Sequence, residues 1–168
     1  MVNTIDFFIG LINKHFGEGT ARPSDIPSRP PCLIVDSTKI LMACRLLHDD
    51  PSASFDMLEC ISGIDNGPEA GTMEVIYHLH SVLLENQIAL RVILKRPVES
   101  GTLPELDSVA GIWRTADWLE RETFDLIGIK FTGHPDLRRI LLPHDWTGHP
   151  LRKDYKTDDY YHHVKIDY

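Results

Sequence analysis

Histidine and carboxylate side chains in the last third of the chain are the first candidates for chemistry. His134, His144, Asp145 and His149 lie within 16 residues of one another, and these side-chain types bind zinc. Their spacing matches no compact ligand motif, and the chain contains no H-E-x-x-H sequence. A small metal-dependent hydrolase built on this segment is therefore an alternative from a different functional class, and not the expected function.

Other reactive groups are equally poorly placed for catalysis. Glu120 and Glu122 are the obvious acid–base pair, but residues two apart on a helix point about 160° away from each other. The chain has no G-x-S-x-G elbow, P-loop or G-x-G-x-x-G motif. Cys32, Cys44 and Cys60 form no C-x-x-C pair, and we expect them to be small core residues. We therefore expect no catalytic, cofactor-binding or metal-binding residue in this chain.

One predicted helix must position most of these residues. Apolar side chains recur at helical spacing between Val109 and Ile127, which predicts a long amphipathic helix over about 105–128 that ends at Gly128. Glu120 falls inside the apolar stripe, and Trp118 falls on the charged face. Two interpretations stay open. Either both residues are covered by this domain itself, or the helix is buried on both sides, against the sheet and against a partner protein.

The second interpretation makes specific demands on the charged residues. Trp118 would be an interface anchor, and Arg121 would lie between Asp117 and Asp125 as an i,i+4 neighbour of each. A half-buried Glu120 carboxylate would need a charged or hydrogen-bonding partner. The basic candidates are Arg138, Arg139, Arg152 and Lys153.

The rest of the chain predicts an α+β fold, with helices packed on one face of a mostly antiparallel sheet. We expect a single domain over residues 1–150 and an extended, partner-binding tail over 151–168. The expected elements are a first helix from Ile5 to Phe16 capped by Asn3, a proline-rich linker over 22–31, a strand at Leu33–Val35, a helix from Asp36 or Ser37 to His48, strands at 55–64, 73–80 and 87–95, and a short strand at 137–142.

Composition excludes some partner classes. The chain has 17 basic and 25 acidic residues, for a net charge of −8, which argues against a nucleic-acid partner. No apolar run approaches the roughly 18 to 20 residues of a membrane span, and the start of the chain lacks a signal-peptide pattern. We therefore expect a soluble intracellular chain with no direct membrane span.

A long ordered motif follows the predicted helix core. It reads Glu120-Arg121-Glu122, Phe124-Asp125-Leu126, Gly128-Ile129, Phe131, Gly133-His134-Pro135, Leu137-Arg138-Arg139-Ile140-Leu141 and Gly148-His149-Pro150-Leu151-Arg152-Lys153-Asp154-Tyr155. This motif resembles the signature of the C subunit, the 30 kDa-type subunit family, of proton-pumping NADH:quinone oxidoreductase, respiratory complex I. The segment from Phe55 to Gly67 also resembles the family's middle strand, whereas the first thirty residues carry no resemblance.

The resemblance implies a non-catalytic structural or assembly subunit of the hydrophilic arm of that complex. It implies no cofactor in this chain, with flavin and iron–sulfur clusters in partner subunits. The implied partners are the large quinone-site subunit and the small iron–sulfur subunits, and the implied location is peripheral, on the cytoplasmic side of the cell membrane. The equivalent subunit of a membrane-bound hydrogenase or of a ferredoxin or deazaflavin dehydrogenase is the nearer alternative. The implied docking and structural residues are Trp118, Glu120, Arg121, Glu122, Asp125, Gly128, His134, Pro135, Arg138, Arg139, His149, Pro150, Arg152, Lys153, Asp154 and Tyr155.

Overall fold

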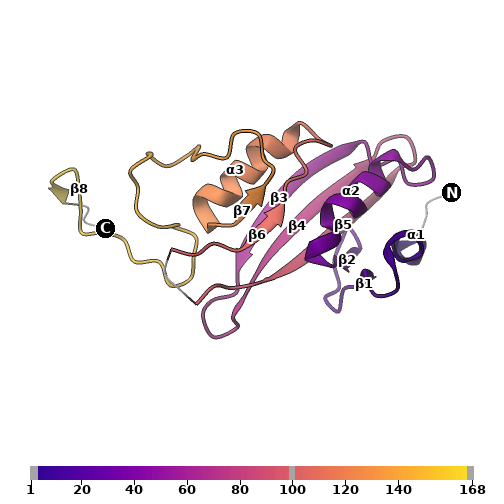
Figure 1. Ribbon diagram of the computed structural model, residues 1–168, viewed down its shortest axis with the longest axis horizontal. Helices are drawn as coiled ribbons and strands as arrows, with labels where there is room; N and C mark the ends of the chain where they lie inside the picture. The colour runs from indigo at the N-terminus through magenta and orange to yellow at the C-terminus, as the bar shows by residue number, and fades with distance from the viewer. Residues whose placement is uncertain (1–3, 99–100, 166–168) are drawn as a thin grey trace.

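A five-stranded mixed sheet organises the chain (Figure 1). The computed structural model describes residues 4–98 and 101–165. The strand order is β1-β2-β5-β4-β3, and only the β2–β5 pairing is parallel. The α+β class with a mostly antiparallel sheet is therefore confirmed. The strands are β1 (Ala21–Pro23), β2 (Cys32–Val35), β3 (Met57–Asp65), β4 (Thr72–Ser81) and β5 (Asn86–Lys95).

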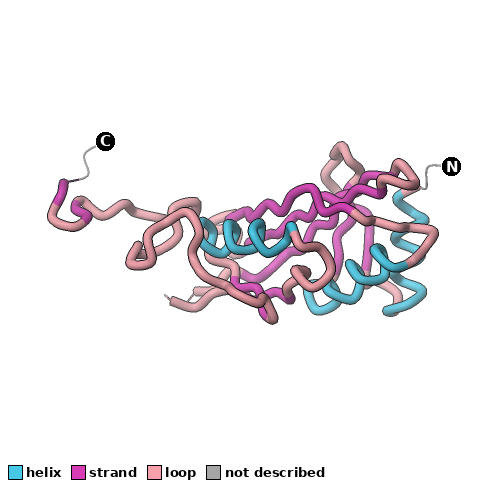
Figure 2. The backbone as a smooth tube through the Cα atoms, turned by 90° about the horizontal axis from the view of Figure 1, so that it is seen from above, coloured by secondary structure: helices cyan, strands magenta, loops and turns pink. Residues whose placement is uncertain are grey.

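Period-two alternation in β4 and β5 places one row of side chains on each face of the sheet. Val75 pairs with Val92, and Tyr77 pairs with Leu90, and all four side chains are buried. The helices cover this face, as the view in Figure 2 shows. They are α1 (Ile5–Phe16), α2 (Ile40–Asp49), which follows a 3-10 turn η1 (Ser37–Lys39), and α3 (Thr115–Ile127).

The predicted caps of the first two helices agree with the structure only in part, because Asp36 caps the 3-10 turn η1 and Lys39 is the N-cap of α2. The Asp36 side chain accepts the N–H of Thr38, as expected of a cap. The predicted Asn3 cap lies outside the described residues, and Thr4 occupies the N-cap position of α1. Cys44 is buried in the core, whereas Cys32 and Cys60 are only partly buried, so the prediction of three core cysteines is wrong for two of them.

The linker and the long helix both differ from the prediction. Arg22 pairs with Ile34 and Pro23 pairs with Leu33, so the first two residues of the expected linker belong to the edge strand β1. Pro23 is tolerated there because an edge strand has a side that needs no donor. The third helix begins at Thr115, not near 105. Residues 105–107 instead form β6 (Glu105–Asp107), which pairs in parallel with β7 (Lys130–Thr132).

The segment between β6 and α3 explains the misleading helical periodicity. Val109 and Trp113 are buried as the periodicity requires, but they flank a turn over 110–112, and the N–H of Trp113 donates to the carbonyl of Val109. The indole Nε1 of Trp113 donates to the carbonyl of Phe55 at 3.1 Å. Apolar spacing records which residues are buried, and a folded-back loop satisfies it as well as a helix does.

The chain beyond β7 is irregular. The predicted strand at 137–142 is absent from the described residues. The N–H groups of Ile140, Leu141 and Leu142 bond to a side chain and not to a neighbouring strand. The C-terminal segment runs away from the sheet in Figure 1 and ends in a small hairpin of β8 (Tyr160–Tyr161) and β9 (Val164–Lys165). Residues 166–168 of the predicted tail lie outside the described part. Within that part, no helix has the length and apolar character needed to cross a membrane.

Candidate functional site

Asp125 is the centre of a hydrogen-bonded cluster on α3. Its buried Oδ2 accepts the N–H groups of Ile140, Leu141 and Leu142 at 3.0, 2.8 and 2.9 Å. Its Oδ1 accepts from Nη1 of Arg139 at 2.6 Å. Burial opposes ionisation, but these donors outweigh it and hold the pKa of Asp125 below its usual value. One helical carboxylate therefore fixes the path of the loop that was predicted to be a strand.

The arginines around this cluster donate most of their hydrogen bonds to backbone carbonyls. Nη2 of Arg139 donates to the carbonyls of Trp146 and Gly148, both at 2.9 Å. Arg121 is buried, and it donates to the carbonyls of Arg138 and Arg139 at 3.2 and 3.3 Å. The expected position of Arg121 between two helical carboxylates is therefore wrong, because the loop carbonyls lie closer.

Glu120 is fully buried, with no exposed surface. The hydroxyl of Ser108 donates to Oε2 at 2.5 Å, and the N–H of Val109 donates to Oε1 at 2.7 Å. Burial raises the pKa of Glu120 to about 7, although both hydrogen bonds oppose the rise. None of the basic candidates bonds to this carboxylate in the described structure, so the expected basic partner is replaced by a serine and a backbone amide.

His134 is the nearest basic group to Glu120, with Nε2 at 4.0 Å from Oε2. Its Nδ1 accepts the N–H of Asp136 at 3.0 Å, which places the ring proton on Nε2. That Nε2 donates to the carbonyl of Asp117 at 3.0 Å. Both ring nitrogens of His134 are therefore hydrogen-bonded, and the side chain ties the following loop to α3.

Residues in the second half of the motif donate hydrogen bonds to the free backbone carbonyls at the C-terminus of α3. Gly128 adopts the left-handed conformation at φ 78°, as predicted for the helix end. Arg152 donates to the carbonyls of Ile127 and Gly128 at 2.8 and 3.0 Å. His149 Nδ1 donates to the carbonyl of Asp125 at 2.9 Å. Burial lowers the pKa of His149.

A further cluster centres on Asp65, a residue that the sequence did not single out. The Asp65 carboxylate accepts from Arg96 at 2.8 Å and from the N–H of Lys153 at 3.0 Å. Arg96 also donates to Asp154 at 2.6 Å. Asp65 is the last residue of an apolar strand and precedes an Asn-Gly turn. A charged residue at the end of an apolar strand was the feature of the sequence that could have marked Asp65 as a candidate.

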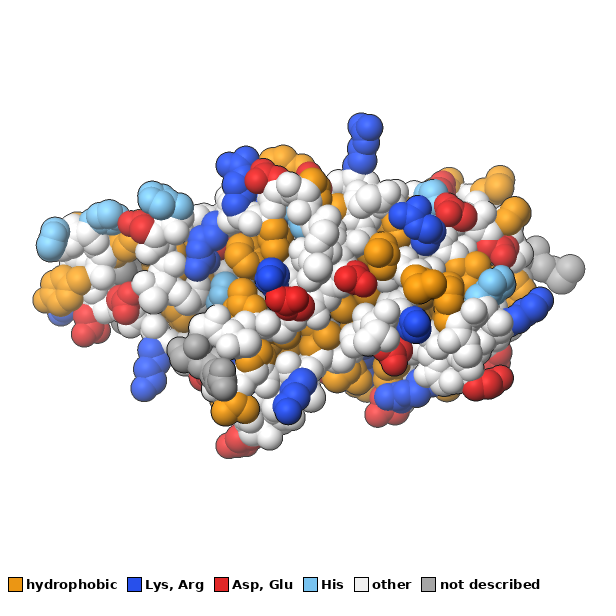
Figure 3. Space-filling view, viewed as in Figure 1, with side chains coloured by type: hydrophobic (Ala, Val, Ile, Leu, Met, Phe, Trp, Pro, Cys, Tyr) orange, Lys and Arg blue, Asp and Glu red, His pale blue; other side chains and the backbone are white. Residues whose placement is uncertain are grey.

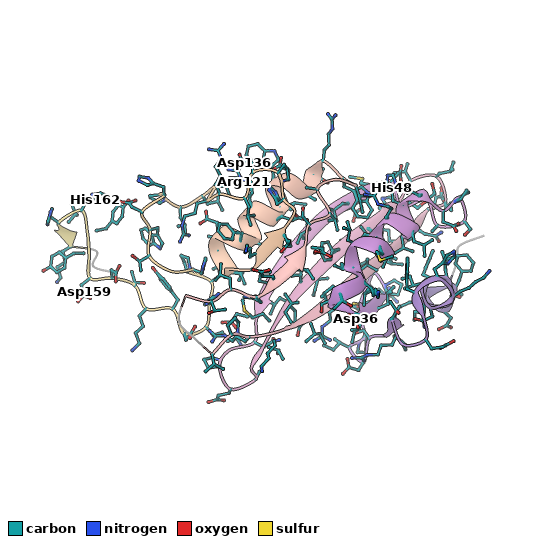
Figure 4. All side chains as sticks on the ribbon, viewed as in Figure 1. Asp36, His48, Arg121, Asp136, Asp159 and His162 are labelled. Carbon is teal, nitrogen blue, oxygen red and sulfur yellow. The ribbon has the colours of Figure 1, made fainter. Side chains whose placement is uncertain are left out.

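The remaining motif residues lie at the surface or at the start of the tail. Trp118 is 62% exposed, and the Arg121 guanidinium lies 5.3 Å from its ring centroid as a cation–π contact. Figure 4 shows Arg121 beside Asp136 where the loop passes α3. Tyr155 accepts from the indole of Trp146 at 3.0 Å. Glu122, Pro135 and Arg138 are exposed, and Pro150 is half-buried.

Comparison with known proteins identifies this arrangement. Residues 33–161 match the profile of the family described as "Respiratory-chain NADH dehydrogenase, 30 Kd subunit". The chain belongs to this family. The matched residues contain β2 without its first residue, α2, β3 to β5, α3 and the whole motif. The family resemblance predicted from the motif is therefore confirmed.

Individual members of the 30 kDa subunit family match nearly the whole chain. The C subunit of the NADH-quinone oxidoreductase of Chlorobium phaeobacteroides is 36% identical over 159 residues, which cover 94% of this chain and 92% of that protein. The protein of the same name from Chloroherpeton thalassium is 38% identical over 162 residues and also matches 94% of this chain, but this chain spans only 63% of it.

The fold of the 30 kDa subunit family also occurs in a solved structure of a different complex. A chain in the structure of the membrane-bound sulfane sulfur reductase, an archaeal respiratory membrane complex, matches with a TM-score of 0.69 and 21% identity. The match covers 90% of this chain and 85% of that one. At this identity the likeness establishes the fold alone.

The histidines do not form a metal centre in the described part of this 30 kDa-type subunit. Residues 4–98 and 101–165 contain no group of three or more His, Cys, Asp or Glu side chains that could hold a metal ion. His48 and His162 lie near opposite ends of the molecule in Figure 4. His134 and His149 already bond to α3 through their ring nitrogens.

Replacing Gly128 with alanine tests the helix end. An added Cβ would meet the His149 ring and come within 2.7 Å of Arg152, at a φ that disfavours L side chains. We expect a loss of about 2 kcal/mol in the free energy of unfolding, measured by urea denaturation of the isolated chain. Gly111→Ala is the matched control, because a Cβ there meets nothing within 4 Å. Equal losses in both variants would contradict this account of the cap.

Proposed function

We propose that this chain is a non-catalytic structural and assembly subunit of the hydrophilic arm of NADH:quinone oxidoreductase. There it supports electron transfer from NADH to quinone coupled to proton translocation. The observation that carries the proposal is how the family motif is used. Asp125, Arg139, His149 and Arg152 all hold the chain after α3 onto that helix, and none is left directed into a substrate cavity among the residues described.

The motif residues form hydrogen bonds within this chain, and these bonds fix the loops after α3 in one conformation. A surface with a fixed conformation is suited to binding a partner protein. The loops over 133–154 are pinned to α3 by charged hydrogen bonds, so the surface that they form is preorganised for a partner. Trp118 stands on that surface with its ring largely exposed, as an interface anchor requires. Apolar side chains also reach the surface between charged ones on the face seen in Figure 3.

The proposed partners follow from the family. They are the large quinone-site subunit and the small iron–sulfur subunits of the same complex, with flavin and iron–sulfur clusters held in those partner subunits and no cofactor in this one. Residues 1–150 would form the docking domain, and the tail over 151–168 would lie along a partner. The complex would place this chain peripherally, on the cytoplasmic side of the cell membrane.

Two alternatives remain for the test to decide. The equivalent subunit of a related membrane-bound hydrogenase or ferredoxin or deazaflavin dehydrogenase would share this fold, as the sulfane sulfur reductase chain does. A metal-dependent hydrolase would need free histidine nitrogens, and His134 has both of its nitrogens engaged.

Affinity purification of the tagged chain from its native cells in mild detergent tests the proposal. We expect recovery of iron–sulfur, flavin and membrane subunits together with NADH:quinone activity. A partner set with hydrogenase or another dehydrogenase activity would replace the quinone enzyme by its relative. Recovery of a lone chain with stoichiometric metal and hydrolase activity would overturn the proposal.

Trp118→Ala should reduce binding of partner subunits without reducing the stability of the isolated chain. Because the Trp118 ring is largely exposed, we expect its loss to change the free energy of unfolding of the isolated chain by less than about 0.5 kcal/mol. We expect at least a tenfold loss of co-purified partner subunits, as for an anchor residue. Leu83→Ala, a 78% exposed residue in the β4–β5 turn, is the control. Unchanged partner recovery in Trp118→Ala would exclude Trp118 as an anchor.

A further inference from the structure

The outer edge of β3 carries backbone groups that no strand satisfies. β3 is the last strand of the five-stranded sheet, and in the described structure it is hydrogen-bonded to β4 alone. The hairpin bond from the N–H of Asn66 to the carbonyl of Thr72 sets the phase of the antiparallel ladder. Counting back along the register, Ser62 and Ile64 bond to β4, whereas Ile61 and Gly63 direct their N–H and C=O groups away from it.

A side-chain contact confirms that phase. The carbonyl of Leu58 belongs to the outward set on the other side of the β-bulge, and it accepts the hydroxyl of Thr115 at 3.1 Å. Thr115 is the first residue of α3, so the helix begins directly beside the open edge. No hydrogen bond to the backbone of Ile61 or Gly63 other than those of the sheet is found in the described residues.

The third helix leaves one of its own sides open along the same edge. Gly63 allows α3 to lie directly on β3, since a Cβ there would be 2.6 Å from the methyl group of Thr123. The opposite side of α3, with Arg121 and Asp125, is covered by the loop over 138–142. The side toward the edge of β3 carries Thr115, Leu119, Glu122 and Leu126, which are exposed or half-buried.

We propose that an extended segment of a partner subunit adds to β3 as a sixth strand and packs its inner side chains on Thr115, Leu119, Glu122 and Leu126 of α3. This inference rests on the proposed function, because it assigns a second contact with a partner subunit, on the side of α3 that the loops over 133–154 leave open. Alternating N–H and C=O groups are satisfied by an extended backbone and not by a helix, whose own backbone groups are already paired. Apolar residues of the segment would contact Leu119 and Leu126.

The negative charge of Glu122 favours a partner subunit over a second copy of this chain as the occupant of the site. Glu122 is exposed in the middle of the open side of α3 and makes no ion pair within the described residues. Two copies joined through β3 about a twofold axis would place their α3 helices, and both Glu122 carboxylates, side by side. A partner segment with a basic residue facing Glu122 avoids this repulsion and gains a complementary charge.

Amide hydrogen exchange, measured residue by residue on the isolated full chain and on the purified complex, tests the inference. In the isolated chain, Ser62 and Ile64 should exchange slowly and Ile61 and Gly63 quickly. In the complex, exchange at Ile61 and Gly63 should slow at least tenfold. Unchanged exchange at both residues in a complex that retains its partner subunits overturns the inference and leaves the proposed function intact. Protection in the isolated chain that rises with concentration also overturns it, because the occupant would be a second copy.

A charge reversal tests the contribution of the helix. Glu122→Lys should lower the recovery of partner subunits at least fivefold, and it should leave the far-ultraviolet circular dichroism of the isolated chain unchanged. Glu18→Lys makes the same change at an exposed position in the loop after α1 and should leave recovery within twofold of the wild type. Equal recovery in the two variants overturns the assignment of Glu122 to the strand-binding site.

Discussion

Asp125→Ala is expected to lower the free energy of unfolding of the isolated chain by about 3–5 kcal/mol, the range for breaking a buried, charge-assisted cluster. The substitution removes the acceptor of three backbone N–H groups, from Ile140, Leu141 and Leu142. It also leaves Arg139 without its carboxylate partner. A protein of this size has about 5–15 kcal/mol in total, so we expect the loop after α3 to detach before the sheet unfolds.

Urea denaturation followed by tryptophan fluorescence measures this loss, since Trp146 lies in the detached segment and Trp113 reports on the core. Asp136→Ala is the matched control, because Asp136 pairs with Arg138 at the surface and should change stability by less than about 0.5 kcal/mol. Asp125→Asn keeps an acceptor and should be less damaging than Asp125→Ala. An Asp125→Ala variant as stable as the control would refute the structural role of this carboxylate.

Glu120→Gln is expected to remove a pH dependence of stability. The pKa of Glu120 is about 7 in the folded chain and has a reference value of 4.5. Between these values the folded state holds a proton that the unfolded state has released. The contribution of Glu120 to stability is therefore greatest below about pH 4.5, falls as pH rises, and is lost by about pH 7. The total fall is about 3 kcal/mol, at about 1.4 kcal/mol for each pKa unit.

Glutamine cannot ionise, and its amide can accept from Val109 and donate to the hydroxyl of Ser108. The difference in unfolding free energy between wild type and Glu120→Gln should therefore shift by about 3 kcal/mol in favour of the variant between pH 4.5 and 7. Taking the difference cancels the other carboxylates, such as Asp65 and Asp125, whose lowered pKa values act in the opposite direction. Glu122→Gln makes the same substitution at an exposed position of the same helix and is the control. Parallel curves for Glu120→Gln would contradict the raised pKa.

The sequence alone predicted the elements whose signals are local. A largely apolar run predicted β3, and period-two alternation predicted β4 and β5. Helical spacing predicted α1 and α2, and Gly128 predicted the end of α3. The sequence placed Trp118 on the charged helical face but left open whether this domain covers it, and the structure shows its side chain exposed. The alternation and the helical spacing depend on the position of a residue within a repeat of 2 or 3.6, which neighbouring residues define. The family resemblance was likewise readable, because its motif is a run of residue types in order.

Only the tertiary structure decided what the charged motif residues bond. Asp125 holds N–H groups 15 to 17 residues away, Glu120 holds Ser108 and Val109, and Arg121 bonds loop carbonyls. The segment over 137–142 looked like a strand because its residues are apolar, but its donors are taken by Asp125 and not by a strand. The start of α3 was misplaced for a similar reason, since a turn buries Val109 and Trp113 as a helix would. Hydrophobic spacing determines which side chains leave water, whereas the partner of each buried polar group depends on which distant segment the fold brings against it.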